Sequence, residues 1–197
     1  MNSGDSIRRT LDEAAAVQAA FRADRTAMAA CEAFADAALA TLRRGGTIFS
    51  CGNGGSMSDA MHFAEEWSGR FRKDRAALPA MAFSDPAAMS CIANDFGFDH
   101  VFARQVEAHG KAGDLLVALS TSGNSPNILL ACEAARQRGL TVVGLLGRGG
   151  GKMKDACDIA VVVPLGTTSD RIQEVHIQVI HAVIEAAERS LFPGNYA

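Results

Sequence analysis

The stretch GNGGSMSDAMHFAEE, residues 52–66, contains two kinds of residue that could do chemistry. A helix is expected over residues 57–69. In it, His62 and Glu66 stand at positions i and i+4, on one face and about 6 Å apart along the axis. That spacing suits two ligands of one metal ion, or a base beside an electrophile. Glu65 points about 100° away from this face and is the less suitable carboxylate. A single His/Glu pair is more often a surface feature, so its meaning depends on the surroundings.

Glycine and hydroxyl residues gather in two segments of the chain. GNGGS (52–56) precedes the helix, and STSGNS (120–125) lies between a predicted strand and another predicted helix. Helix N-termini attract anions, hydroxyls add donors, and glycine lets the backbone approach a ligand. Neither segment matches a Walker loop or the dinucleotide-binding fingerprint. Together they predict a site for one small phosphorylated ligand, whereas GRGGGK (147–152) is interpreted as a flexible connection.

The last predicted helix carries further polar side chains in DRIQEVHIQVIH, residues 170–181. On a helical wheel, Asp170 lies within about 20° of His181. His176 lies about 140° from His181, so the two histidines are not expected to share a site. Gln173 lies about 12 Å from His181 along the axis, and its amide is expected to contact either a shared metal ion or the substrate.

The hydrophobic pattern predicts the elements that must position these residues. Residues 5–44 are alanine-rich, with apolar side chains at helical spacing, which predicts two helices or one helix bent near 22–26. Farther on, short apolar runs alternate with helical stretches, as in a parallel sheet covered on both faces. The expected strands are 47–51, 79–83, 114–119, 141–146 and 159–164, with helices near 57–69, 86–93, 99–109, 125–138 and 168–191. In such a five-stranded, doubly wound α/β fold, ligands bind beyond the carboxyl ends of the strands, where both small-residue loops lie.

The composition limits the classes of function. The chain has 197 residues, and 48% of them are hydrophobic. It contains no apolar run near the roughly 18 residues needed to cross a bilayer, and its N-terminus lacks a signal-peptide core, so a cytoplasmic protein is expected. The net charge of −3 gives no reason to expect a nucleic-acid or membrane partner. The five scattered cysteines include no CxxC pair and are expected to be free thiols.

Four segments together resemble the sugar isomerase (SIS) domain family: GNGGSMSDAMHFAEEWSGRF, SCIANDFGFDHVF, STSGNSPN and DRIQEVHIQVIH. The second and fourth are the more specific and are similar to members that isomerise seven-carbon sugar phosphates. The resemblance covers nearly all of residues 45–191. It implies a flavodoxin-like fold, with residues 1–197 as a single SIS domain and residues 1–44 as a helical extension used in oligomerisation. It also implies a homotetramer with active sites where subunits meet.

The resemblance further implies a reaction, the conversion of sedoheptulose 7-phosphate to D-glycero-D-manno-heptose 7-phosphate through an enediol(ate). This would be the first step of ADP- or GDP-heptose precursor synthesis for lipopolysaccharide or capsule. Such chemistry needs a base near C1 and C2, an acid for the oxygens, and stabilisation of developing charge. The implied catalytic residues are Glu66 as base, His181 as acid/base partner, Asp95 as helper, and Gln173. One Zn²⁺ ion per subunit would be held by His62, Glu66, Gln173 and His181.

Substrate contacts are implied in the same way. The phosphate would be bound by Ser56, Ser120, Thr121, Ser122 and Ser125, with charge added by Arg70 of the same or a neighbouring subunit. The remaining contacts would be Asn53, Gly54, Gly55, Glu66, Asn94, Asp95 and Gln173. On their own, ANDFGFD (93–99) would be a turn and RFRKDR (70–75) a solvated cluster. His100 and His109 belong to no such group and are expected at the surface.

Two alternatives remain open at this point. The chain could be a non-catalytic SIS-domain binding protein, of the kind that partners a replication initiator. It could also isomerise another sugar phosphate, such as a pentose or hexose phosphate. A binding module has no need to keep His62, Glu66, Gln173 and His181 together, whereas the phosphate-binding residues would look the same for any of these sugars.

Overall fold

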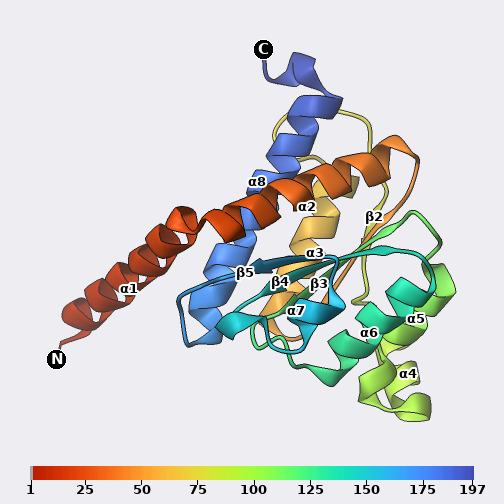
Figure 1. Cartoon of the computed structure of the whole chain (residues 1–197), viewed down its shortest axis with the longest axis horizontal. Coiled ribbons are helices and arrows are strands. Elements are labelled where there is room, and N and C mark those ends of the chain that lie inside the picture. Colours follow the sequence, from red (N-terminus) through yellow and green to blue (C-terminus); the bar gives the residue numbers. More distant parts are fainter. Residues whose placement is uncertain (1) are drawn as a thin grey trace.

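Within residues 2–197, which the computed structural model describes, the chain folds around a five-stranded sheet whose strands are all parallel (Figure 1). Met1, the first residue of the predicted domain, lies outside the described residues. The strands are β1 Ile48–Gly52, β2 Ala80–Ala82, β3 Leu115–Ser120, β4 Thr141–Leu146 and β5 Ile159–Val162. Their order in space is β2-β1-β3-β4-β5, the order of flavodoxin-like folds. The predicted fold class is confirmed.

Helices connect the strands and cover both faces of the sheet (Figure 1). The α-helices are α1 Ser3–Ala23, α2 Arg25–Arg43, α3 Gly55–Ser68, α4 Pro86–Phe96, α5 Ala103–His109, α6 Pro126–Gln137, α7 Met153–Ala156 and α8 Ser169–Leu191. The 3₁₀ turns are η1 Phe98–His100, η2 Arg148–Gly150 and η3 Pro193–Asn195. One face packs against α2, α3 and α8, and the other against α4, α5, α6 and α7.

Strand β3 shows why the strands could be recognised in the sequence. All six of its residues are buried. Leu115, Val117 and Leu119 enter the core beneath α2, α3 and α8. Leu116 and Ala118 enter the core on the opposite face. Because both faces are covered, the strand is a continuous apolar run rather than an alternating one.

The N-terminal region forms two separate helices, one of the two arrangements predicted for it. They part at Asp24, whose carboxylate accepts hydrogen bonds from the backbone N–H groups of Thr26 at 2.8 Å and Ala27 at 3.0 Å. This N-cap starts α2 as a separate helix. Helix α1 projects from the body of the molecule (Figure 1) and leaves Ile7 and Leu11 more than 60% exposed.

Among residues 2–197, every helix is too short or too polar to span a membrane.

Candidate active site

Two loops leave the carboxyl ends of neighbouring strands at the middle of the sheet. The loop after β1 leads into α3, and the loop after β3 leads into α6. The strand order reverses between β1 and β3, and at such a switch point a crevice opens. A pocket of about 120 Å³ lies there, lined by Asn53, Ser56, Leu119, Ser120, Thr121, Ser125, Ser169 and Gln173. All of these except Leu119 and Ser169 are residues for which the sequence predicted substrate contacts.

The hydroxyl groups of this pocket are arranged around Ser120. Its Oγ lies 3.2 Å from Ser125 Oγ and 3.5 Å from Ser122 Oγ, and it accepts a hydrogen bond from the Gly123 N–H at 3.1 Å. Ser125 is the N-cap residue of α6. Several hydroxyls at a helix N-terminus can donate hydrogen bonds to a phosphate, and the helix dipole favours the negative charge.

Asn53 and Asn127 tie the two loops together. Each side-chain amide donates a hydrogen bond to the amide oxygen of the other, both at 2.9 Å. Asn127 is buried at the start of α6 and was not predicted as a site residue, although it lies within STSGNSPN. The pair fixes the spacing of the loops, and it occupies the amide of Asn53, which was predicted to contact the substrate.

The glycine-rich segment 147–152 packs against the loop after β3. The N–H of Met153, just beyond the segment, donates a hydrogen bond to the Gly123 carbonyl at 2.9 Å. Gly123 has a φ of +63°, and a Cβ there would strike the carbonyl oxygen of Gly150. The two loops can approach so closely only because Gly123 has no side chain. The interpretation of this segment as a flexible connection is therefore wrong, since it packs against and supports the loop of residues 120–125, called the phosphate-type loop below.

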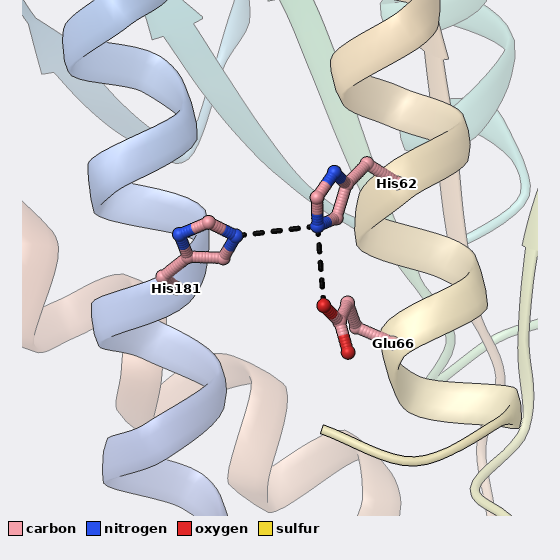
Figure 2. Close-up of side chains that lie close together, drawn as sticks. All are labelled: His62, Glu66 and His181. Atoms are coloured by element: carbon pink, nitrogen blue, oxygen red, sulfur yellow. Dashed lines mark hydrogen bonds and ion pairs between the residues drawn. The ribbon is translucent and has the colours of Figure 1, made fainter. Parts of the chain in front are cut away.

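A second cluster lies between α3 and α8, formed by His62, Glu66 and His181 (Figure 2). His62 Nε2 lies 3.1 Å from Glu66 Oε1 and 3.2 Å from His181 Nε2. Three ligand atoms, one from each residue, all lie within 4.8 Å of one another. The i, i+4 spacing on α3 thus aims both side chains at α8, as expected from the sequence.

Glu65 is placed differently from Glu66, although the two are adjacent. The nearest approach of its carboxylate to His62 Nε2 is 4.0 Å, and its side chain is 65% exposed. The Glu66 side chain is only 15% exposed. Of the two carboxylates, Glu66 is therefore the one that faces the cluster.

The contacts within this cluster fit a bound cation. A neutral ring nitrogen carries either one hydrogen or one lone pair, so His62 Nε2 cannot both donate to Glu66 and accept from His181. Three such atoms turned toward one point satisfy a metal ion better than they satisfy one another. Two ligand atoms of a tetrahedral zinc ion, each about 2.0–2.1 Å from it, lie about 3.3 Å apart, close to the separations found here. Two imidazoles and a carboxylate also suit zinc among the divalent metals.

Burial shifts the protonation of two groups on these helices. Burial, followed by the nearby charge of His62, holds the pKa of His181 below its ordinary value, against an opposing effect of Glu66. A lower pKa keeps the ring neutral, which is the form that binds a metal or accepts a proton. Burial also raises the pKa of Asp59, one turn before His62, to about 6, an effect that His62 partly offsets.

Known proteins resemble this chain in sequence and in fold. The sequence profile described as SIS domain matches residues 11–147. A phosphoheptose isomerase of Vibrio cholerae is 50% identical over 187 residues, covering 95% of this chain and 98% of that protein. A phosphoheptose isomerase of Fusobacterium nucleatum is 54% identical over 78% of each chain. The solved structure of a phosphoheptose isomerase from Neisseria gonorrhoeae matches with a TM-score of 0.86 and 38% identity, covering 95% of this chain and 99% of that one.

The chain belongs to the phosphoheptose isomerase family of SIS-domain proteins.

Three residues that the resemblance assigns to the phosphoheptose isomerase site lie on the outside of this single chain. Arg70, Asn94 and Asp95 are exposed. Asn94 and Asp95 lie on α4, across the sheet from α3 and α8 (Figure 1), where the Asn94 amide donates to Asp95 Oδ1 at 2.7 Å. Among residues 2–197, none of the three lines the pocket around Ser120, called the phosphate-type pocket below. None belongs to the cluster of His62, Glu66 and His181 either.

The other predicted polar residues of the last helix divide between two environments. Gln173 Nε2 donates to Ser56 Oγ at 3.2 Å, so its amide lies at the phosphate-type pocket rather than in the cluster around His62. His176 is fully buried, and its Nε2 lies 3.2 Å from the Leu146 carbonyl oxygen. It therefore shares no site with His181, as the helical wheel predicted. In this member of the phosphoheptose isomerase family, His100 and His109 are exposed.

Proposed function

We propose that this chain is a phosphoheptose isomerase, which converts sedoheptulose 7-phosphate to D-glycero-D-manno-heptose 7-phosphate. The observation that carries the proposal is the meeting of His62, Glu66 and His181 on the same helix pair that carries the phosphate-type pocket. Ser56 and His62 are six residues apart on α3, or about 9 Å along the axis. A phosphorylated sugar chain of several carbons can span that distance, with its phosphate at the hydroxyls and its carbonyl end at the cluster.

The reaction moves a proton between C1 and C2. Glu66 is the proposed base, because one carboxylate oxygen is directed at His62 and the other has no protein hydrogen-bond partner among residues 2–197. His181 is the proposed acid/base partner at the sugar oxygens, a role open to its neutral ring while Nε2 is not bound to zinc. Asp95 would assist from α4 of a neighbouring subunit. The hydroxyls of Ser56, Ser120, Thr121, Ser122 and Ser125 would hold the phosphate, with Asn53, Gly54, Gly55 and Asn94 along the sugar.

One Zn²⁺ ion per subunit is proposed at His62, Glu66 and His181, the three residues whose donor atoms fit it. When bound, zinc supplies polarisation of the substrate carbonyl and stabilisation of oxyanion charge. Gln173 is the proposed additional ligand or substrate contact. Its amide is near the cluster's helix pair but hydrogen-bonded to Ser56, so either role requires that it exchange this partner.

A homotetramer with active sites between subunits is proposed for the assembly, with residues 1–44 contributing to its contacts and residues 1–197 acting as one SIS domain. The exposed Ile7 and Leu11 of the projecting α1 support this, because apolar side chains on a helix are stabilised when another chain covers them. The exposure of Arg70, Asn94 and Asp95 supports sites shared between subunits. The proposed setting is the cytoplasm, in heptose synthesis for lipopolysaccharide or capsule.

The experiment that tests the function is a turnover assay with a panel of ketose phosphates. The zinc-loaded protein is incubated with sedoheptulose 7-phosphate and with pentulose and hexulose phosphates, and the aldose products are quantified. Preferred turnover of the seven-carbon substrate supports the proposal. Preferred turnover of a shorter sugar, or binding without turnover, would overturn it in favour of another isomerase or a binding protein.

A further inference from the structure

Beyond the end of α3, the side chain of Arg75 is buried against α8. Its exposed fraction is 1%, as is that of Glu188, and Arg75 Nε donates to Glu188 Oε1 at 2.7 Å. The two residues are 113 positions apart in the sequence. Replacing a buried ion pair by well-packed apolar side chains is often neutral or stabilising, so this pair is weak evidence for stability alone.

The rest of the Arg75 guanidinium binds backbone carbonyls where α3 ends. Nη2 donates to the carbonyl of Glu66 at 2.6 Å, and Nη1 donates to those of Trp67 at 2.7 Å and Gly69 at 3.1 Å. The last carbonyls of a helix have no partners within the helix, and a cation there also favours the helix dipole. Arg75 therefore caps the turn of α3 that carries Glu66, and it bonds to Glu66 itself.

Glu188 is held from its other side as well. Its Oε2 accepts a hydrogen bond from the Tyr196 hydroxyl at 2.8 Å. Burial and then this hydrogen bond raise the pKa of Tyr196 to about 12, so the hydroxyl keeps its proton. Glu188 follows His181 by seven residues, two helical turns, so the two side chains leave α8 within about 20° of each other, toward α3.

Three polar contacts consequently run along the α3–α8 interface in the same order on both helices. Ser56 meets Gln173 near the start of α3, His62 meets His181 in the middle, and Arg75 meets Glu188 beyond the end. Figure 2 shows the middle contact, with His62 and His181 reaching across the space between the two helices. The outer contacts lie on either side of the cluster and can hold the helices in register.

We propose that Arg75 and Glu188 are positioning residues, which cap α3 and lock it against α8 so that Glu66 and His62 face His181. The inference rests on the proposed function, since it concerns the same site. The planar fork of arginine is essential to this role, because a lysine could pair with Glu188 but could not also bind the carbonyls of Glu66, Trp67 and Gly69.

The test compares Arg75→Lys, Glu188→Gln and wild-type full-length protein, each freed of metal by chelation. Co²⁺ serves as the metal probe, because its visible absorption reports the geometry of its ligands, and kcat and KM are measured after zinc loading. Glu188→Gln keeps the size of the side chain and is the second variant if Arg75→Lys folds poorly. Val106→Ala is the matched control. Val106 is buried in the core on the opposite face of the sheet, so this substitution should destabilise the fold without touching the site.

We expect Arg75→Lys to bind Co²⁺ about 10-fold more weakly, with an altered absorption spectrum, as for loss of a group that orients a ligand. kcat should fall about 10-fold or more, with KM near the wild-type value, because the phosphate-type loops lie at the far end of α3. For Glu188→Gln, the Co²⁺ affinity and kcat should lie between those of Arg75→Lys and those of the wild type. Val106→Ala should keep wild-type Co²⁺ affinity and kcat.

Equal Co²⁺ affinity, spectrum and kcat in Arg75→Lys and Val106→Ala would overturn the inference, as would a wild-type protein that binds no Co²⁺. The proposed function can fail separately. If wild-type protein turns over no heptose phosphate while Arg75→Lys still weakens Co²⁺ binding and alters its spectrum, the isomerase assignment falls and the positioning role stands.

Discussion

His62 Nε2 lies 3.2 Å from His181 Nε2, although 119 residues separate the two histidines. The contact joins α3, which begins at one small-residue loop, to α8, which closes the phosphate-type pocket through Ser169 and Gln173. One pair of helices therefore carries both the pocket lined by hydroxyls and the cluster of His62, Glu66 and His181. In the proposed function, the glycines and hydroxyls of residues 52–66 and their histidine and carboxylate address the two ends of one substrate.

Replacing a cluster histidine should remove the metal. His62→Ala leaves one imidazole and one carboxylate, too few protein ligands for a typical zinc site. Loss of a hydrogen-bond partner that only orients a ligand lowers metal affinity by roughly 10- to 100-fold, and we expect a larger fall in zinc affinity here. Metal content after dialysis measures this, with His109→Gln, an exposed histidine outside the cluster, as the control. Equal zinc content in the two variants would exclude His62 as a ligand.

The brace behind the phosphate-type loop should be sensitive to a single methyl group. Gly123→Ala combines a positive φ with a collision against the Gly150 carbonyl, so we expect a raised KM and a loss of roughly 1–3 kcal/mol of stability. Gly45→Ala is the matched control, because Gly45 has a φ of +76° with no atom within 4 Å of the added carbon. If both variants show the same KM, the brace has no role in substrate binding.

His176 should make the fold sensitive to acid. Its pKa is lowered to about 4 by burial, against a weaker opposing effect of the Leu146 carbonyl. Between pH 6.5 and 4 the unfolded chain binds a proton at this site and the folded chain does not, so stability falls as pH falls through this window. The loss amounts to roughly 3 kcal/mol at most. His176→Gln should flatten this part of the profile of unfolding free energy against pH, measured by urea denaturation. If the slope between pH 6.5 and 4 is unchanged in His176→Gln, burial does not lower the pKa of His176 as described.

Local patterns in the sequence were sufficient for part of this structure. Continuous apolar runs located the strands, because both faces of the sheet are covered, and the break near residues 22–26 coincides with the Asp24 cap. Helical spacing alone distinguishes Glu66 from Glu65, since neighbouring residues on a helix point about 100° apart.

Other features depend on residues that the fold brings together from distant positions. The Asn53–Asn127 pair and the Arg75–Glu188 pair have no local signature, because each joins segments 74 or more residues apart. The role of segment 147–152 could not be predicted either, since its glycines gain meaning only against Gly123. Asn94 and Asp95 lie on α4, across the sheet from the cluster, a separation that only the folded chain reveals.

Turnover of sedoheptulose 7-phosphate by zinc-loaded wild-type, Glu66→Gln and Glu65→Gln proteins tests the isomerase centre most directly. The wild-type chain should form D-glycero-D-manno-heptose 7-phosphate. Glu66→Gln should lower kcat by roughly 10²-fold or more, the scale of general acid–base catalysis. Glu65→Gln should stay near the wild-type rate, because Glu65 faces solvent. Absence of product with the wild-type chain, or near-normal turnover by Glu66→Gln, would contradict the assignment of His62, Glu66 and His181 as the isomerase centre.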